Sequence, residues 1–283
     1  MPELTHDGRR FAWREAGTDA AGVPVLFAHC SLAHSGLWKP MLTALAPERP
    51  VYAVDMPGHG ASDPPPEGMS LQLHALGACL ALMERIGRPV HLVGLSLGGA
   101  VLGRAALRRP DLTASVTLIE PVWFHLLNDA GHRAKERDLS AQLVAHIESG
   151  DALGGAKLFV EKWGAPGGFE ALGPEGQQYA ARCLVHLAKD FAMVSGHPPG
   201  QVTPAEIATM QPPALLIAGG ESPRQAHAVL DAIRAALPSA RRRTVPGAGH
   251  LSPVTHWKEV LEMLRAFHAE VEAAAPAARK ASA

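Results

Sequence analysis

Cysteine is scarce in this chain, with three residues among 283, at positions 30, 79 and 183. Because they are widely spaced and odd in number, they form neither a disulfide framework nor a C-x-x-C metal motif. The H-E-x-x-H spacing of zinc proteases is also missing among the 15 histidines. We therefore expect no metal ion and a reducing compartment.

Excess charge and long apolar runs are missing as well. The chain has 26 basic and 27 acidic residues, which argues against nucleic acid or an anionic membrane as a partner bound by charge. No stretch approaches the roughly 18 apolar residues of a membrane span, and the first ten residues lack the apolar segment of a signal peptide. We expect a cytoplasmic protein whose partner is a small-molecule substrate, while the oligomeric state is left open.

The segments that are present predict an α/β fold, because short apolar runs alternate with longer amphipathic ones. This rhythm favours a doubly wound, mostly parallel sheet covered by helices. The expected strands are residues 4–6, 9–15, 23–29, 51–55, 90–94, 115–120, 214–218 and 242–245. The expected helices are residues 35–45, 70–86, 97–108, 223–237 and 255–273.

The alternation stops between residues 121 and 203, where only helical patterns occur, at 138–148, 150–163 and 175–194. This segment is predicted to be a helical insertion in a core made of residues 1–120 and 204–273. Residues 274–283 consist of Ala, Lys, Arg and Ser with one Pro, and we expect them to form a disordered tail.

The most informative motif is G-L-S-L-G-G at residues 94–99, directly after an apolar strand and before a helix. In a G-x-S-x-G turn of this kind the serine sits on a sharp bend with its hydroxyl exposed, and glycines relieve the crowding. Ser96 is therefore a candidate nucleophile. The alternative is a glycine-rich turn whose serine only caps the following helix.

A serine hydroxyl needs a base, and the base needs an orienting acid. His250 is the best candidate base, because it lies in a loop of small residues after the last strand, and such loops meet at the carboxyl edge of the sheet. The amides of Leu97 and of Ser31 are the candidate oxyanion donors. His29 and the turn at residues 55–63 are expected to hold the surrounding loops.

Together these motifs resemble the α/β-hydrolase superfamily, in its serine hydrolase branch, over residues 10–273. They are His29-Cys30 followed by Trp38, D-M-P-G-H-G-A-S-D at 55–63, the serine turn at 94–99, and G-A-G-H at 247–250, in the order and spacing of the family. The resemblance implies an eight-stranded sheet and a helical cap at residues 121–203.

Two positions depart from the family pattern. Cys30 stands where many members have glycine. A cysteine would be strained there if the position needed a positive φ. Ser222 stands where the acid of the triad usually lies. The acid is then Glu120 at the end of the sixth strand, as in a similar group of haloalkane dehalogenases, or the adjacent Glu221, or it is missing altogether.

The resemblance and the residues lead to one main hypothesis. The chain is expected to be a serine hydrolase that cleaves a small or medium carboxylic ester, thioester or lactone through an acyl-enzyme on Ser96, without a cofactor. Carbon–carbon bond hydrolysis and cofactor-free perhydrolysis use the same residues and stay open. A member of the family that binds a small molecule without catalysis is the hypothesis from another class.

Overall fold

The computed structural model describes residues 1–164, 167–195 and 201–281, and within them eight strands form one sheet in the order β1-β2-β4-β3-β5-β6-β7-β8. The pairs β1–β2 and β2–β4 are antiparallel, and the other pairs are parallel. The strands are β1 (Glu3–His6), β2 (Arg9–Ala16), β3 (Val25–Ala28), β4 (Val51–Val54), β5 (Val90–Leu95), β6 (Thr113–Ile119), β7 (Ala214–Gly219) and β8 (Arg241–Val245). The expected mostly parallel, eight-stranded sheet is confirmed.

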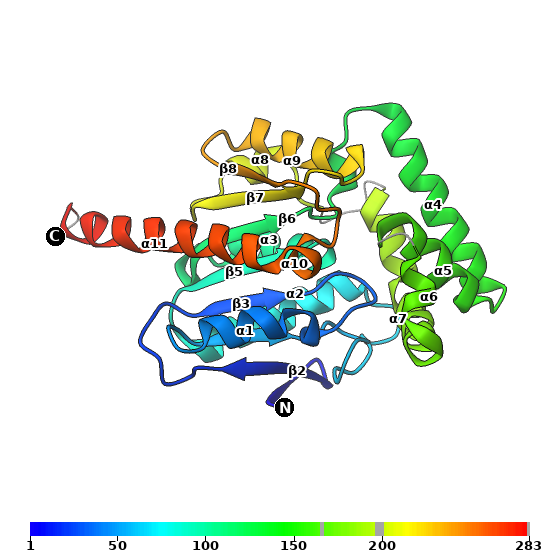
Figure 1. The fold of residues 1–283 in the computed structure, drawn as a ribbon, viewed down its shortest axis with the longest axis horizontal. Coiled ribbons are helices and arrows are strands. Elements are labelled where there is room, and N and C mark those ends of the chain that lie inside the picture. The colour runs from blue at the N-terminus through cyan, green and yellow to red at the C-terminus, as the bar shows by residue number, and fades with distance from the viewer. Residues whose placement is uncertain (165–166, 196–200, 282–283) are drawn as a thin grey trace.

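Helices cover both faces of this sheet (Figure 1). On one face α1 (Lys39–Leu45) and α11 (Trp257–Ala281) pack on residues such as Phe27 of β3. On the other face α2 (Leu71–Ile86), α3 (Leu97–Arg108) and α9 (Arg224–Ala236) share a core with Leu26, the neighbour of Phe27. Because successive side chains of a strand point to opposite faces, a strand buried on both sides is apolar throughout.

Short elements connect these layers. They are the 3-10 helices η1 (Ser35–Trp38), η2 (Pro110–Leu112) and η3 (Phe124–Leu126), and the helices α8 (Pro204–Ala208) and α10 (Ser252–Thr255). The hydrophobic pattern of the sequence predicts none of η2, η3 and α8, each of which has five residues or fewer. Such short elements contain too few residues for a hydrophobic period to be recognised.

A helical insertion follows β6 and lies beyond the carboxyl ends of the parallel strands (Figure 1). It consists of α4 (Ala130–Glu148), α5 (Ala152–Trp163), α6 (Gly168–Ala171) and α7 (Gly173–Ser195), and its described residues include no strand. Helix α4 begins at Ala130 instead of residue 138, because Asp129 caps it by accepting a hydrogen bond from the His132 amide at 2.7 Å.

Polar side chains of α7 tie the helical insertion to the core. Asp190 accepts hydrogen bonds from the Ser70 hydroxyl at 2.6 Å and from the amides of Leu71 and Gln72 at 2.8 and 3.0 Å. These groups lie at the N-terminus of α2, where amides have no acceptor within the helix. The Tyr179 hydroxyl donates to the Ala33 carbonyl at 2.8 Å.

The C-terminal helix differs from the expectation. α11 continues to Ala281, so residues 274–281 are helical instead of a disordered tail, and residues 282–283 lie outside the described part of the chain. Apart from Pro276, these residues are Ala, Arg and Lys, which have a high helix propensity. No helix in the described part is long and apolar enough to span a membrane.

Candidate active site

Ser96 lies on the bend between β5 and α3, with φ 57° and ψ −113°, a strained conformation for a residue that is not glycine. The bend is possible only because its neighbours are small. A Cβ on Gly94 would lie 2.4 Å from the Gly98 carbonyl oxygen, and one on Gly98 would lie 2.2 Å from the Ala28 carbonyl oxygen. Within the described chain, the Ser96 side chain makes no capping hydrogen bond to α3. The structure therefore does not support the capping role.

His250 and Glu120 are brought together although 130 residues separate them in the sequence. His250 Nδ1 lies 2.6 Å from Glu120 Oε2, and both side chains are buried. Because Nδ1 donates its proton to this carboxylate, Nε2 of the same ring is left to accept one. Ser96 and His250 line the same groove. The indole ring of Trp163 from α5 packs against the His250 ring, with the ring centroids 5.1 Å apart.

Glu120 is held by two further donors. Its Oε1 accepts hydrogen bonds from the Ser222 hydroxyl at 2.6 Å and from the Gly219 amide at 2.7 Å. Burial alone would raise the pKa of Glu120, but the hydrogen bond and charge of His250, together with these two donors, lower it below its ordinary value. The site thus holds a carboxylate with every partner in place.

Glu221, the alternative acid, lies elsewhere. Its side chain is exposed, and its backbone amide donates to the Ala248 carbonyl at 2.9 Å. The structure therefore brings Glu120, and not Glu221, to His250. Ser222, at the position where the family has its acid, serves instead as a hydrogen-bond donor to Glu120.

The loop after β3 places Ser31 beside Ser96, and Ser31, Ser96 and Leu97 all line one inner cavity. Cys30 does not have a positive φ, so the missing glycine causes no strain there, and the positive φ of this loop falls on Leu32 at 60°. Burial raises the pKa of the Cys30 thiol to about 12. The thiol is therefore protonated at neutral pH, which argues against Cys30 as a nucleophile.

Two buried histidines hold this loop and the turn at residues 55–63. His29 Nδ1 lies 2.7 Å from the Cys30 carbonyl oxygen, and His29 Nε2 accepts from the Met56 amide at 2.9 Å. His59 Nε2 accepts from the Leu32 amide at 3.2 Å. Burial lowers the pKa of His29 to about 4 and the pKa of His59 to about 3, so both rings are neutral. Their expected positioning role agrees with these contacts.

Asp55 holds the same two segments with its carboxylate. Oδ1 accepts from the Ser35 amide at 2.7 Å, and Oδ2 accepts from the Ala61 amide at 2.9 Å. A Cβ on Gly60, which has φ 56°, would lie 2.2 Å from the Asp55 carboxyl carbon, so only glycine fits there. The turn is thereby fixed against the loop that carries Ser31.

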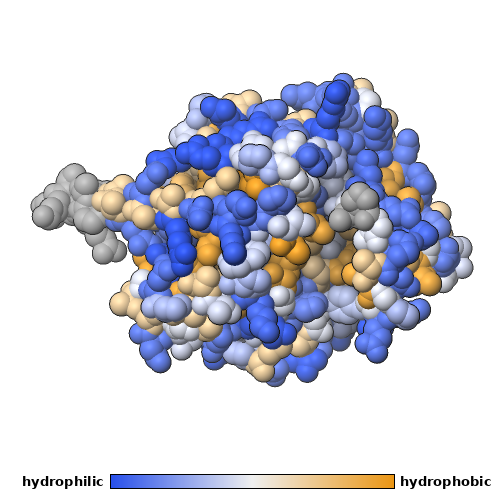
Figure 2. All heavy atoms as spheres, in the orientation of Figure 1, coloured by the Kyte–Doolittle hydropathy of each residue, from blue (hydrophilic) through white to orange (hydrophobic). Residues whose placement is uncertain are grey.

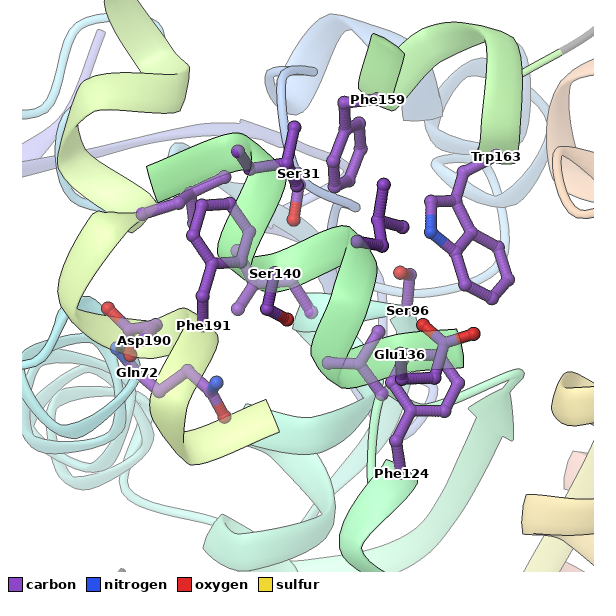
Figure 3. A pocket seen from close by; sticks show the side chains of 15 residues that line it. Ser31, Gln72, Ser96, Phe124, Glu136, Ser140, Phe159, Trp163, Asp190 and Phe191 are labelled. Carbon is purple, nitrogen blue, oxygen red and sulfur yellow. Dashed lines mark hydrogen bonds between the residues drawn. The ribbon is translucent and has the colours of Figure 1, made fainter. Parts of the chain in front are cut away.

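Ser96 stands where two spaces meet. One is a groove of about 1000 Å³ between the core and the helical insertion, and His250 and Tyr179 also line it. Figure 2 shows hydrophobic side chains gathered along this boundary. The other is an inner cavity of about 40 Å³, which Ser96 also lines and whose walls include Phe124, Trp163 and the carboxyl group of Glu136 (Figure 3). A substrate bound at Ser96 can therefore place its two ends in different surroundings.

Groups able to hold a metal ion lie apart from Ser96. In the part of the chain that the structure describes, His6, Asp7 and His74 are the one set of three whose ligand atoms all lie within 4.8 Å of one another. They belong to β1, the turn after it, and α2. None of the three lines the groove or the inner cavity.

Two features of the site do not follow from the motifs of the sequence. The sequence does contain a hint of the role of Ser222, because a hydroxyl replaces the usual acid in a run that otherwise fits the family. It contains no hint of the role of Glu136, since a charged residue on an amphipathic helix is usually exposed to solvent. The structure instead makes it 3% exposed, on the wall of the inner cavity.

Known proteins that are similar to this chain indicate its family. A model of the alpha/beta hydrolase family matches residues 25–263. Pimeloyl-[acyl-carrier protein] methyl ester esterase of Xylella fastidiosa is 25% identical over 263 residues, which cover 87% of this chain and 95% of that protein. A solved hydrolase from Pseudomonas aeruginosa is 25% identical with a TM-score of 0.72, covering 94% of this chain and 97% of its own.

Other relatives match over a shorter span. Monoacylglycerol lipase ABHD6 of Bos taurus is 29% identical over 132 residues, which are 44% of this chain and only 38% of the lipase. The chain thus spans well under half of that relative. The fold expected from the sequence and the expectation of a hydrolase are confirmed by these relatives taken together.

Proposed function

The chain belongs to the α/β-hydrolase family, and we propose that within it the chain is a serine hydrolase of a small or medium carboxylic ester. The observation that carries this proposal is the 2.6 Å hydrogen bond between His250 Nδ1 and Glu120, beside the strained bend that bears Ser96. A relative of nearly equal length is named as a methyl ester esterase, which supports ester chemistry.

In the proposed reaction, Ser96 Oγ attacks the carbonyl carbon of the ester while His250 Nε2 takes the hydroxyl proton. The amides of Leu97 and Ser31 hold the negative oxygen of the tetrahedral intermediate. His250 then gives the proton to the departing alkoxide, which leaves an acyl group on Ser96. Water attacks this acyl-enzyme with His250 again as the base, and the free acid departs.

Glu120 orients the ring of His250 and stabilises its positive form during both steps. Ser222 and the Gly219 amide keep the carboxylate in place through Oε1, which leaves Oε2 for the histidine. In this proposal the helical insertion acts as a cap. Its α5 residue Trp163 shields the His250 ring from water, which strengthens the electrostatic interactions of the site.

The test is hydrolysis of p-nitrophenyl acetate and butyrate by the wild type and by Ser96→Ala, with folding checked by circular dichroism. We expect Ser96→Ala to abolish turnover and labelling by a fluorophosphonate probe, which reacts only with an activated serine. A folded wild type that neither turns over the esters nor reacts with the probe would overturn the proposal and favour a binding protein.

A further inference from the structure

The inner cavity beside Ser96 contains a carboxyl group that the proposed reaction does not use. Glu136 of α4 is 3% exposed and lines this cavity together with Ser96 (Figure 3). Within the described residues, its Oε1 atom is buried without a hydrogen-bond partner. A buried carboxyl oxygen in this state costs free energy unless something donates to it.

The carboxyl group of Glu136 lies on the buried, otherwise apolar face of α4. The buried residues of α4 are Glu136, Leu139 and Leu143, which lie on one face of the helix at spacings of three and four. Burial raises the pKa of Glu136, although the charge of Lys162 and a hydrogen bond from Gln225 act in the opposite direction. A leucine would fill this place at lower cost, so the carboxyl group calls for a ligand that donates to it.

Asp190 is the contrasting acid in the same lining. It is equally buried, but both of its oxygens accept hydrogen bonds from the first turn of α2. Asp190 therefore joins the helical insertion to the core and is not available to a ligand. Of these two carboxyl groups, only Glu136 has an oxygen without a partner among the residues that the structure describes.

Resting on the proposed function, we infer that Glu136 is a specificity residue that accepts a hydrogen bond from the acyl part of the substrate. The acyl group is short, because the inner cavity has a volume of about 40 Å³, and a space of this kind holds only a few water-sized groups. It bears a hydroxyl or an ammonium group, whose proton reaches Glu136 Oε1. Phe124 and Trp163 flank its carbon chain, and the alcohol part lies in the wide groove.

Esters of matched shape test this inference. Methyl 3-hydroxybutyrate and methyl 3-aminobutyrate each have the shape of methyl 3-methylbutyrate. The measured quantity is the ratio of kcat/KM for a donor ester to that for its alkyl partner. The proteins are the wild type, Glu136→Leu, Glu136→Gln and, as a control, Glu148→Leu on an exposed position of the same helix.

We expect the wild type to prefer a donor ester at least about tenfold in one matched set, because a donor satisfies the buried carboxyl oxygen and an alkyl group does not. Glu136→Leu should reverse the preference, and Glu148→Leu should keep it. Glu136→Gln should retain part of the preference for a hydroxyl and lose that for an ammonium group. The 3-hydroxy and 3-amino esters thereby distinguish the two kinds of donor.

The outcomes separate this inference from the proposed function. If the alkyl esters are hydrolysed and the ratio is the same in Glu136→Leu as in the wild type, the inference is overturned and the hydrolase remains. If the wild type hydrolyses none of the esters, the proposed function fails, and binding is measured instead by calorimetry. Tighter binding of a donor ester than of its alkyl partner, lost in Glu136→Leu, supports the inference, and equal binding overturns it.

Discussion

Two glutamates lie in the two regions that enclose Ser96, and their surroundings differ in almost every respect except burial. Glu120, at the end of β6 in the core, is 2% exposed, and Glu136, in the helical insertion, is 3% exposed. Glu120 accepts from three groups, and its pKa is lowered. Glu136 has one oxygen without a partner in the described part of the chain, and burial raises its pKa. The core thus presents a completed site, and the helical insertion presents an incomplete one that a ligand can complete.

The largest expected effect concerns Glu120 in catalysis. Glu120→Gln should lower kcat for p-nitrophenyl butyrate by about 10⁴, the size of loss expected when a neutral amide replaces the acid of a triad. Glu221→Gln is the control, because its exposed side chain lies away from His250, and its kcat should stay within about twofold. A large loss in Glu221→Gln with little change in Glu120→Gln would reverse the assignment of the acid.

The second prediction compares the two glutamates in stability. Glu120→Leu leaves His250, Ser222 and the Gly219 amide without their acceptor, and we expect it to lower the free energy of unfolding by about 3 kcal/mol. Glu136→Leu removes a carboxyl group of which one oxygen has no partner among the described residues, so the free energy of unfolding should stay within about 1 kcal/mol or rise. Urea unfolding measures both. Equal losses of unfolding free energy in the two variants would show that Glu120 and Glu136 do not differ in their contribution to stability.

A smaller effect on kcat is expected for Ser222, whose hydroxyl donates a hydrogen bond to Glu120 at 2.6 Å. Ser222→Ala should lower kcat about tenfold, because the carboxylate loses one charge-assisted hydrogen bond and with it part of its orientation. Ser252→Ala is a matched control, since Ser252 is also buried and its hydroxyl has no partner within the described residues. Steady-state kinetics with p-nitrophenyl butyrate compares them, and identical rates would show that Ser222 has no positioning role.

The smallest effect is a dependence on pH. Because the pKa of Glu120 is lower in the folded protein than its ordinary value of 4.5, its stabilising contribution is complete above that value and is lost as the pH falls through the lower, native pKa. The stability difference between wild type and Glu120→Gln should therefore shrink on acidification. Urea unfolding at pH 6.5 and pH 4 measures it. A difference that grows at pH 4 would contradict the lowered pKa.

The sheet and the serine turn could be predicted because their signals are local. All eight strands were expected, the central ones from their apolar runs, and the glycines at 94 and 98 indicate the bend at Ser96 from the sequence alone. The choice between Glu120 and Glu221 was not decidable in this way. It depends on the direction in which a side chain leaves the end of its strand, and on partners about 100 residues away.

The helical insertion was predicted less completely, for reasons that its residues make plain. The first turns of α4, residues 130–137, are mostly polar and show no hydrophobic period, so its start was placed too late. Glu136 was overlooked because a charged residue at helical spacing normally faces solvent. The packing of α4 against α5 and α7 turns that position inward.

The contact of Asp190 with the first turn of α2 also bears on how the chain folds. A core helix here depends for its N-terminal hydrogen bonds on a residue that follows it by more than a hundred positions, inside a segment that looks separable in the sequence. Cutting out that segment would leave the Leu71 and Gln72 amides without an acceptor. The helical insertion is therefore not a removable accessory: grafting it onto a related core would require an acid at the matching position as well as matching loops.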